Sequence, residues 1–440
     1  MKVYLTTLGC KLNESELEAW TRQFAERGDE IVRDAREADL CIVNTCTVTQ
    51  AAAKKSRLLA RKTAQLNPAA PVVLTGCYAT MSREEALRLP NVAFVVPNPD
   101  KDRLVELAAR YHGDPSFERV ANGCRMPEAA SGELAHPRTR AFVKIEDGCN
   151  MSCTYCIIPL ARGRSRSRPQ AEIVAEVRGL VESGYQEVIL TGVQISDYRY
   201  DEREPGQGRL RALNELVRAI LSETSLPRLR LTSIAPWELE EEFLDLFADS
   251  RLCRHLHLSL QSGSTTVLRR MRRPYSAEQF ADAVAMARAR VPEVGITTDV
   301  IVGFPGESQV EFDQSCEFVE RIQFARVHVF PYSARAGTAA ATLPLPVADP
   351  VKDARARAMQ AVADQSIGNF VQRFVGRTLP VLYEAESSMP GVWSGYTDNY
   401  IRVIARSQEN LANRIIPTKI VEVIEDGARG EVTHHAMHIL

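Results

Sequence analysis

The stretch VKIEDGCNMSCTYCIIPLARGRSRSR, residues 143–168, decides how the centre of this chain folds. It places Cys149, Cys153 and Cys156 in a C-x3-C-x2-C triplet directly after an apolar run that is typical of a strand. The glycine, asparagine and serine residues between the cysteines indicate a loop rather than a helix. Three thiolates on one short loop suit a four-iron cluster in which the fourth iron stays open for chemistry.

A structural zinc site is the alternative interpretation of this triplet. Such sites usually have four ligands in paired C-x2-C units, yet the next cysteine after the triplet is the distant Cys253. The triplet, with Tyr155 before its third cysteine, resembles the signature of radical S-adenosylmethionine (SAM) enzymes. That resemblance implies that the open iron binds the amino and carboxylate groups of SAM.

The composition is that of an ordinary globular chain long enough for two or three domains. Its 440 residues are 45% hydrophobic and 25% charged, with a formal net charge of −2, so no global basic character indicates a nucleic-acid partner. No apolar run reaches membrane-spanning length, and the first residues do not resemble a signal peptide. Ten cysteines in such a chain favour reduced thiols and metal ligation. We therefore expect a cytoplasmic protein with no membrane partner.

Residues 1–112 alternate between strand-like and helix-like segments. This alternation predicts a doubly wound, mostly parallel sheet. The expected strands are 2–9, 38–45, 71–76 and 91–97, and the expected helices are 14–28, 49–66 and 82–90.

Three cysteines follow three of these predicted strands. Cys10, Cys46 and Cys77 each stand at the carboxyl end of a strand, and such ends meet at one edge of a parallel sheet. Cys41 instead lies inside a strand, and we assign it to the core. The segments GCKLN, NTCTVT and GCY also resemble the N-terminal domain of the methylthiotransferases, which are radical SAM enzymes with two clusters. The resemblance implies that Cys10, Cys46 and Cys77 hold an auxiliary 4Fe-4S cluster.

Residues 113–137, which include Cys124 as an incidental thiol, are rich in glycine, proline, serine and alanine and predict a linker. From 138 to 370 six strand–helix units follow, too few for an eight-unit barrel. We expect a partial (β/α)6 barrel, which is also the fold that the radical SAM resemblance implies. Its expected strands are 140–145, 187–193, 228–234, 255–261, 295–304 and 324–332.

Candidate SAM contacts stand at the carboxyl ends of these strands, where parallel barrels build their sites. The segment VIVGFPGE, which ends at Glu307, resembles the radical SAM motif that packs near the adenine. Taken alone, this glycine-containing segment equally fits a turn that ends a strand. The candidate cofactor-binding residues are Tyr155, Gly192, Ser233, Gln261, Asp299, Gly303 and Glu307.

Residues 371–440 contain short, evenly spaced strand patterns, which predict a small all-β barrel. This end of the chain resembles the TRAM domain, an RNA-binding barrel. Trp393, Tyr396 and Tyr400 are candidate stacking surfaces for bases. The four arginines of 161–168 fit a solvated face and phosphate contacts equally well. Three histidines near the end are expected on a strand surface: His434, His435 and His438.

Together these resemblances imply a methylthiotransferase that uses two 4Fe-4S clusters and SAM. The segments TLGCKLN, NTCTVT and GCYA are most similar to the branch that methylthiolates C2 of N6-threonylcarbamoyladenosine at position 37 of tRNA. That activity implies a tRNA anticodon stem-loop, a flavodoxin- or ferredoxin-like electron donor and a sulfur donor as partners. N6-isopentenyladenosine and a ribosomal-protein aspartate are alternative targets. A non-catalytic iron–sulfur electron carrier or RNA adaptor is the alternative from another class.

Overall fold

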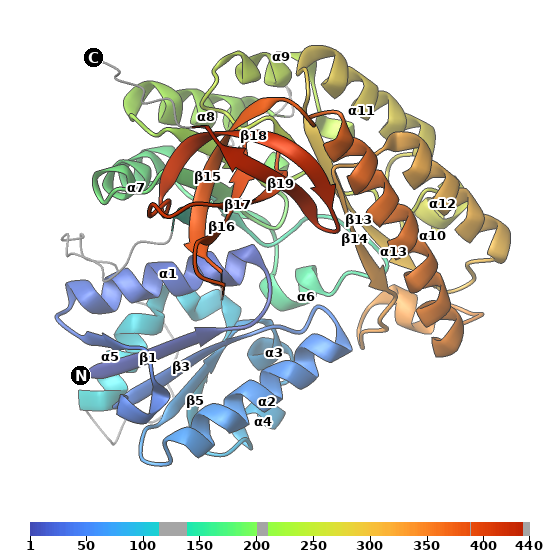
Figure 1. Cartoon of the computed structure of the whole chain (residues 1–440). Coiled ribbons are helices and arrows are strands. Elements are labelled where there is room, and N and C mark those ends of the chain that lie inside the picture. Colours follow the sequence, from blue (N-terminus) through green and yellow to red (C-terminus); the bar gives the residue numbers. More distant parts are fainter. Residues whose placement is uncertain (114–138, 200–209, 388, 434–440) are drawn as a thin grey trace. The chain divides into compact units, whose positions relative to one another are not determined.

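Five parallel strands form the first sheet of the computed structural model, which describes residues 1–113, 139–199, 210–387 and 389–433 (Figure 1). Their order is β2-β1-β3-β4-β5, so the chain winds outward in both directions from its first strand. The short edge strand β2 was not predicted. The bounds are β1 Lys2–Thr7, β2 Glu30–Val32, β3 Leu40–Thr45, β4 Val72–Thr75 and β5 Val92–Val96.

Helices cover both faces of this sheet, which confirms the predicted doubly wound fold. Trp20 and Phe24 of α1 (Lys11–Glu26) pack on one face together with α5 (Leu104–Gly113). Small residues of α2 (Gln50–Leu66) pack on the other face, against Cys41, which is fully buried as expected. Three short helices follow the last strands: α3 Gly76–Met81, α4 Arg83–Leu87 and the 3-10 helix Asn98–Arg103.

The six strands predicted for the central region are all present, and every pair among them is parallel. They form a three-stranded sheet, β10-β9-β6, and a four-stranded sheet, β11-β12-β13-β14. Only Thr232 separates β10 from β11, so the third predicted strand serves both sheets. The bounds are β6 Arg140–Lys144, β9 Glu187–Thr191, β10 Arg228–Leu231, β11 Ser233–Ile234, β12 His255–Leu258, β13 Gly295–Val302 and β14 Arg326–Pro331.

One large apolar core joins these strands to the helices outside them, as in a partial (β/α)6 barrel. The long helices are amphipathic, and their apolar residues face the strands. The helix bounds are α7 Gln170–Glu182, α8 Arg211–Glu223, α9 Glu241–Leu244, α10 Thr265–Arg270, α11 Ala277–Arg290, α12 Gln309–Ile322 and α13 Asp349–Gln372. Beside the cysteine loop lie the short elements β7 Glu146–Asp147, α6 Ile158–Arg162 and β8 Arg166–Ser167.

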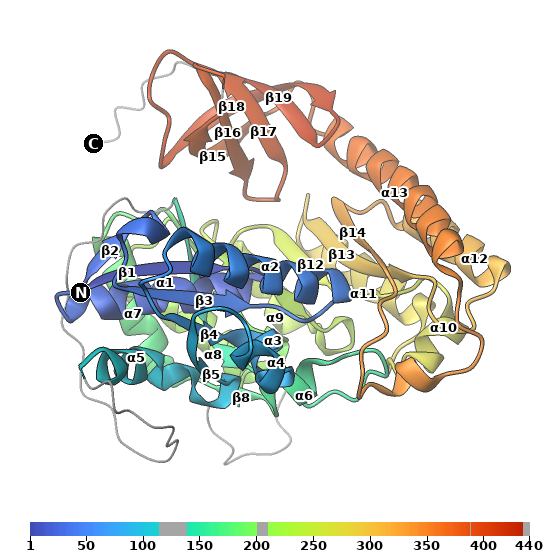
Figure 2. The same ribbon diagram turned by 90° about the horizontal axis from the view of Figure 1, so that it is seen from below.

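Five strands at the end of the chain close into the predicted all-β barrel, in the order β15-β16-β17-β19-β18. Closure leaves no strand edge unpaired, and the barrel has its own apolar core. Figure 2 shows that α13 leads directly into it. The bounds are β15 Thr378–Glu386, β16 Val392–Thr397, β17 Arg402–Arg406, β18 Arg414–Ile424 and β19 Gly427–Val432.

By its internal contacts the chain divides into two units, which are described separately below. Unit 1 comprises Met1–His136, Asp147–Arg166 and Ser333–Ala341, and unit 2 comprises Pro137–Glu146, Ser167–Tyr332 and Thr342–Leu440. All six candidate ligand cysteines lie in unit 1. The domain boundaries expected from the sequence stay a prediction.

Some of the expectations lie outside the described residues. The predicted linker at 113–137, including Cys124, is one of them, apart from its first residue Gly113. The three terminal histidines His434, His435 and His438 are the others. Within the part of the chain that is described, no helix combines the length and apolar character needed to cross a membrane.

Candidate functional site

Cys46 and Cys77 follow neighbouring strands of the unit 1 sheet. Asn44 pairs with Thr75, and a bridge then joins Thr45 to Gly76, so the two cysteines leave the sheet side by side. Both thiols are buried. The parallel pairing of β3 with β4 therefore creates this juxtaposition without any local motif.

Cys10 reaches the same edge from β1. The N–H of Leu8 donates to the carbonyl oxygen of Asn44 at 3.0 Å, which fixes the end of β1 beside the end of β3. A Cβ atom on Gly9 would lie 3.2 Å from Sγ of Cys46, so the turn before Cys10 passes directly over that thiol. Cys10 itself is exposed and immediately precedes α1 as its N-cap residue. The three cysteines thus gather at one sheet edge, and their role as ligands stays a prediction.

Replacing Gly76 with alanine is expected to destabilise the fold by about 1–3 kcal/mol. Gly76 has a φ of +96°, and an added Cβ would lie 2.2 Å from the carbonyl oxygen of Thr45. Thermal unfolding of the full-length chain measures the loss. Gly28 is the matched control, because it has a φ of +84° but no neighbouring atom within 4 Å of the added Cβ. An equal loss for Gly28→Ala would show that close approach to β3 is not the cause.

The environment of Cys46 opposes ionisation when no ligand is bound. The pKa of its thiol is raised to about 11, chiefly by burial and also by the nearby Cys10 and Cys77, while the backbone of Val48 and the charge of Arg162 oppose the rise. Metal ligation requires the thiolate. If Cys46 ligates iron as predicted, the metal supplies the positive charge that keeps its thiol deprotonated.

The second set of cysteines lies on a closed loop of the same unit. The N–H of Cys149 donates to the carbonyl oxygen of Gly163 at 3.1 Å, and the N–H of Cys156 donates to that of Cys153 at 3.1 Å. Met151 donates its N–H to Sγ of Cys149 at 3.4 Å, a contact that favours a charged sulfur. Cys149 is buried, whereas Cys153 and Cys156 are half-buried.

The donor chemistry of the two sets fits two four-iron clusters. Each set offers three sulfur atoms, and thiolates are the ligands that such clusters take, one for each iron. Among the described residues, no three histidine, cysteine or carboxylate side chains lie close enough together to hold a single metal ion. Cluster binding is thus compatible with the residues present, with Cys10, Cys46 and Cys77 as one set and Cys149, Cys153 and Cys156 as the other.

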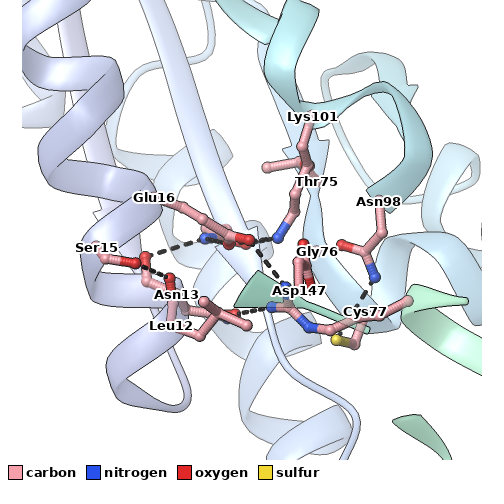
Figure 3. A network of polar contacts seen from close by, with 12 residues as sticks. Leu12, Asn13, Ser15, Glu16, Thr75, Gly76, Cys77, Asn98, Lys101 and Asp147 are labelled. Carbon is pink, nitrogen blue, oxygen red and sulfur yellow. Dashed lines mark hydrogen bonds and ion pairs between the residues drawn. The ribbon is translucent and has the colours of Figure 1, made fainter. Parts of the chain in front are cut away.

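Sequence reasoning missed a buried polar network beside these cysteines (Figure 3). Arg162, two per cent exposed, donates to Glu16 and Asp147 at 2.9 Å each and to Asn13 at 2.7 Å. The ammonium group of Lys101 also pairs with Glu16. Arg162 is therefore neither a solvated nor a phosphate-binding arginine, which corrects both interpretations of 161–168 at this position. In contrast, Arg164 and Arg166 are exposed.

The candidate SAM contacts are divided between the units. Tyr155 lies half-buried in unit 1, and the other six lie in unit 2. Gly192 follows β9, where a Cβ would lie 2.8 Å from a carboxylate oxygen of Glu146. That oxygen accepts hydrogen bonds from the N–H groups of Val193 and Gln194 at 2.9 and 3.2 Å. The glycine thus lets the chain close around a buried carboxylate.

Three of the candidates lie in or just beyond three successive strands of the second sheet in unit 2, β11, β12 and β13. Ser233 of β11 pairs with His257 of β12, and the ring of His257 lies 3.3 Å from Oδ2 of Asp299 in β13. Gln261, at a φ of +71°, donates its N–H to the carbonyl oxygen of Asp299 at 2.8 Å. His257 was not among the candidates, although the alternation of HLHLSLQ placed it on the same face as His255.

The GFPGE turn is held by its own carboxylate. Gly303, with a φ of +72°, donates its N–H to Oε2 of Glu307 at 2.6 Å, and Arg355 donates to the same oxygen at 2.8 Å. Glu307 is buried. Its carboxylate therefore shapes the strand end, and contact with adenine stays a prediction for this turn.

Of the aromatic residues expected to stack on bases, Trp393 is buried, so that interpretation is wrong for it, whereas Tyr396 and Tyr400 are half-buried and stacking on bases stays a prediction for them. Trp393 belongs to the core of the terminal barrel. The Tyr396 ring lies 4.6 Å from the Arg140 guanidinium, and the Tyr400 ring stacks on His255 at 4.4 Å. These rings join the barrel to the strands of the same unit.

Comparison with known proteins gives two family matches and many full-length relatives. The pattern described as the radical SAM superfamily matches residues 143–319, and that of Uncharacterized protein family UPF0004 matches residues 2–97. A protein from Bacillus subtilis (strain 168), "Threonylcarbamoyladenosine tRNA methylthiotransferase MtaB", is 36% identical over 98% of this chain and 97% of its own.

More distant similarities also cover most of the chain. A "tRNA-2-methylthio-N(6)-dimethylallyladenosine synthase" from Methylacidiphilum infernorum (isolate V4) is 32% identical over 96% of this chain and 92% of its own. Among solved structures, the radical SAM methyltransferase TsrM from Kitasatospora setae superposes with a TM-score of 0.55 at 17% identity. That superposition covers 75% of this chain and 74% of TsrM, and it shows a shared fold alone.

Proposed function

We propose that this chain, which belongs to the radical SAM methylthiotransferase family, methylthiolates C2 of N6-threonylcarbamoyladenosine at position 37 of tRNA. The observation that carries the proposal is the gathering of Cys10, Cys46 and Cys77 at one sheet edge, in the same unit as the loop of Cys149, Cys153 and Cys156. Two sets of three thiols are what a two-cluster transferase needs and a simple electron carrier does not. The relatives named for threonylcarbamoyladenosine are 34–36% identical to the chain.

In this proposal each set of cysteines holds one 4Fe-4S cluster. When bound, the two clusters and two molecules of SAM supply the radical chemistry, the sulfur and the methyl group that convert a C–H bond into C–S–CH3. The residues of the chain hold and orient these groups. Cys149, Cys153 and Cys156 leave one iron open for SAM, and Tyr155 lies next to the last of them.

The strand ends of unit 2 bind SAM in this proposal. Gly192 and Gly303 let the strand ends turn closely against Glu146 and Lys352. Ser233 of β11 and Asp299 of β13 offer polar groups, as does Gln261 just beyond β12, while Glu307 fixes the GFPGE turn that follows β13.

The remaining partners follow from the chemistry. Each turnover consumes electrons and sulfur, so the enzyme requires an electron donor of the flavodoxin or ferredoxin type and a sulfur donor. The tRNA anticodon stem-loop is the substrate. We place the reaction in the cytoplasm, where tRNA and a reducing environment for free thiols are both present.

The test is mass spectrometry of tRNA nucleosides from cells with and without the gene. We expect 2-methylthio-N6-threonylcarbamoyladenosine to disappear on deletion and to return with the wild-type gene but not with Cys77→Ala. Loss of the dimethylallyl analogue instead would favour the second candidate, for which the 32% identity to synthases of that name is the supporting observation. If neither nucleoside changes, the target is not tRNA, and the ribosomal-protein aspartate is next to be examined.

A further inference from the structure

Four charged side chains are buried together beneath the strand edge that carries Cys10, Cys46 and Cys77. Glu16 accepts hydrogen bonds from Arg162 through Oε1 and from Lys101 through Oε2, and Arg162 also pairs with Asp147. The side chains of Glu16, Lys101 and Arg162 are only 1–2% exposed. Burying charged side chains costs free energy, and they stay ionised only when each lies beside an opposite charge.

Amides connect this network to two of the three cysteines, of which Figure 3 labels Cys77. Asn13 accepts from Arg162 at 2.7 Å, and its Oδ1 lies 3.9 Å from Sγ of Cys10. Asn98 donates through Nδ2 both to Sγ of Cys77 at 3.6 Å and to the carbonyl oxygen of Ala161 at 2.6 Å. Because Ala161 precedes Arg162, the segment after Cys156 is held to the other cysteine set at two points.

The charges of the network balance, two cations against two carboxylates. Burial disfavours the charged form of Arg162, but Glu16, Cys77, Asp147 and Cys10 outweigh it and raise its pKa well above the ordinary value. Charges interact more strongly in a poorly solvated interior than in water, so removing one of these four side-chain charges would leave a net charge that acts on the nearby cysteine sulfurs. The potential of an iron–sulfur cluster depends on the local charge and on hydrogen bonds to its sulfurs.

We propose that Arg162 and Glu16 are positioning residues that set the reduction potential of the cluster held by Cys10, Cys46 and Cys77. Arg162 raises this potential, because its positive charge stabilises the added electron, and Glu16 lowers it. The inference rests on the proposed ligation by these cysteines. Asn13 and Asn98 hold the network at a fixed position beside the sulfurs.

The experiment is a redox titration that is monitored by electron paramagnetic resonance. It is carried out on the full-length reconstituted protein and on a triple variant of it with Cys149→Ala, Cys153→Ala and Cys156→Ala. The triple variant leaves one cluster, of about four irons, whose signal does not overlap with another. We expect Arg162→Met to lower the midpoint potential by the equivalent of about tenfold in the one-electron equilibrium constant, about 59 mV. Glu16→Gln should raise it by a similar amount.

Two further variants separate charge from structure. Arg162→Lys keeps the charge and should return the potential most of the way to that of the wild type. Arg166→Met makes the same substitution at an exposed arginine four positions along the chain and should leave the potential unchanged. A merely structural role predicts that Arg162→Met and Glu16→Gln act in the same direction.

The inference would be overturned if Arg162→Met and Glu16→Gln shifted the midpoint potential in the same direction, or if neither shifted it while the iron content stayed unchanged. Either result would leave the proposed function standing. If Arg162→Met fails to retain iron, the other two variants test the inference. It then requires that Glu16→Gln raises the midpoint potential and that Arg162→Lys keeps it close to the wild-type value. If the triple variant binds no iron at all, the proposed ligation fails and the inference falls with it.

Discussion

Replacing Cys77 with alanine is expected to lower the iron content from about eight to about four atoms per chain and to abolish methylthiolation. Cys77 is the first residue after the Thr45–Gly76 bridge, where no other thiol of the described chain can take its place at the same strand end. A cubane with only two thiolate ligands is not retained. The second cluster, on the loop of Cys149, should persist and still cleave SAM.

The matched control is Cys41→Ala. Cys41 lies inside β3, fully buried in the core of unit 1, five residues before Cys46. Its replacement should cost about 1 kcal/mol of stability and leave about eight irons and full activity. Iron analysis, together with the yield of 5′-deoxyadenosine from SAM, measures both variants. If Cys77→Ala kept eight irons, Cys77 would not be a ligand.

The fold could be predicted because its signals are local. Each central strand, such as β3 with the sequence LCIVNT, is a short apolar run bounded by turn residues. Parallel order then follows from the helices between the strands. The three-residue strand β2 (EIV) escaped prediction because it is too short to show a pattern, and pairing with β1 alone defines it.

The gathering of Cys10, Cys46 and Cys77 could also be predicted, because a rule about strand ends connects positions far apart in the sequence. The network beside them follows no such rule. Glu16 and Arg162 are 146 positions apart, and in the sequence Glu16 is an ordinary charged residue of a predicted helix while Arg162 is one of four alternating arginines. Only the tertiary fold shows that both are buried.

The aromatic residues of the terminal barrel show the same limit of sequence reasoning. Tyr396 and Tyr400 have the composition of a base-stacking surface, and nothing near them in sequence shows what covers them. The arginines that contact their rings belong to β6 and β10: Arg140 lies over Tyr396 and Arg230 over Tyr400. An aromatic residue on a small barrel serves packing or stacking equally well, and the tertiary partner decides between them.

Arg230 also forms an ion pair with Glu187, and among the described residues of unit 2 this pair is fully buried. Glu187, the first residue of β9, receives two hydrogen bonds from Arg230 at 2.7 and 3.1 Å, and both side chains are fully buried. Arg230 also donates to the carbonyl oxygens of Asp398 at 2.9 Å and Thr397 at 3.1 Å. The pair therefore connects the strand starts to the turn after β16.

The pH dependence of this pair has a definite sign. Burial alone would raise the pKa of Glu187, but Arg230, Arg140 and Arg228 together hold it below its ordinary value of 4.5. As the pH falls below 4.5, the unfolded chain therefore takes up a proton before the folded one does. The stability that this carboxylate contributes is complete above that pH and is lost as the pH falls through the lowered pKa.

Replacing Glu187 with glutamine is accordingly expected to destabilise unit 2 by about 3–5 kcal/mol at pH 7, because it leaves Arg230 buried without its counter-charge. Urea denaturation of the full-length chain, followed by the fluorescence of its tryptophans, measures the shift in midpoint at pH 7 and at lower pH. The difference from the wild type should shrink as the pH falls through the lowered pKa.

Glu384→Gln is the matched control, because it removes another carboxylate from the same group of arginines. Its partner Arg140 lies at 2.7 Å, but both side chains are partly exposed, and water can replace the lost contact. We expect a loss of less than about 1 kcal/mol. Equal losses for Glu384→Gln and Glu187→Gln would mean that the buried pair contributes no more than a surface pair. The terminal barrel would then be held by its apolar core and backbone contacts instead.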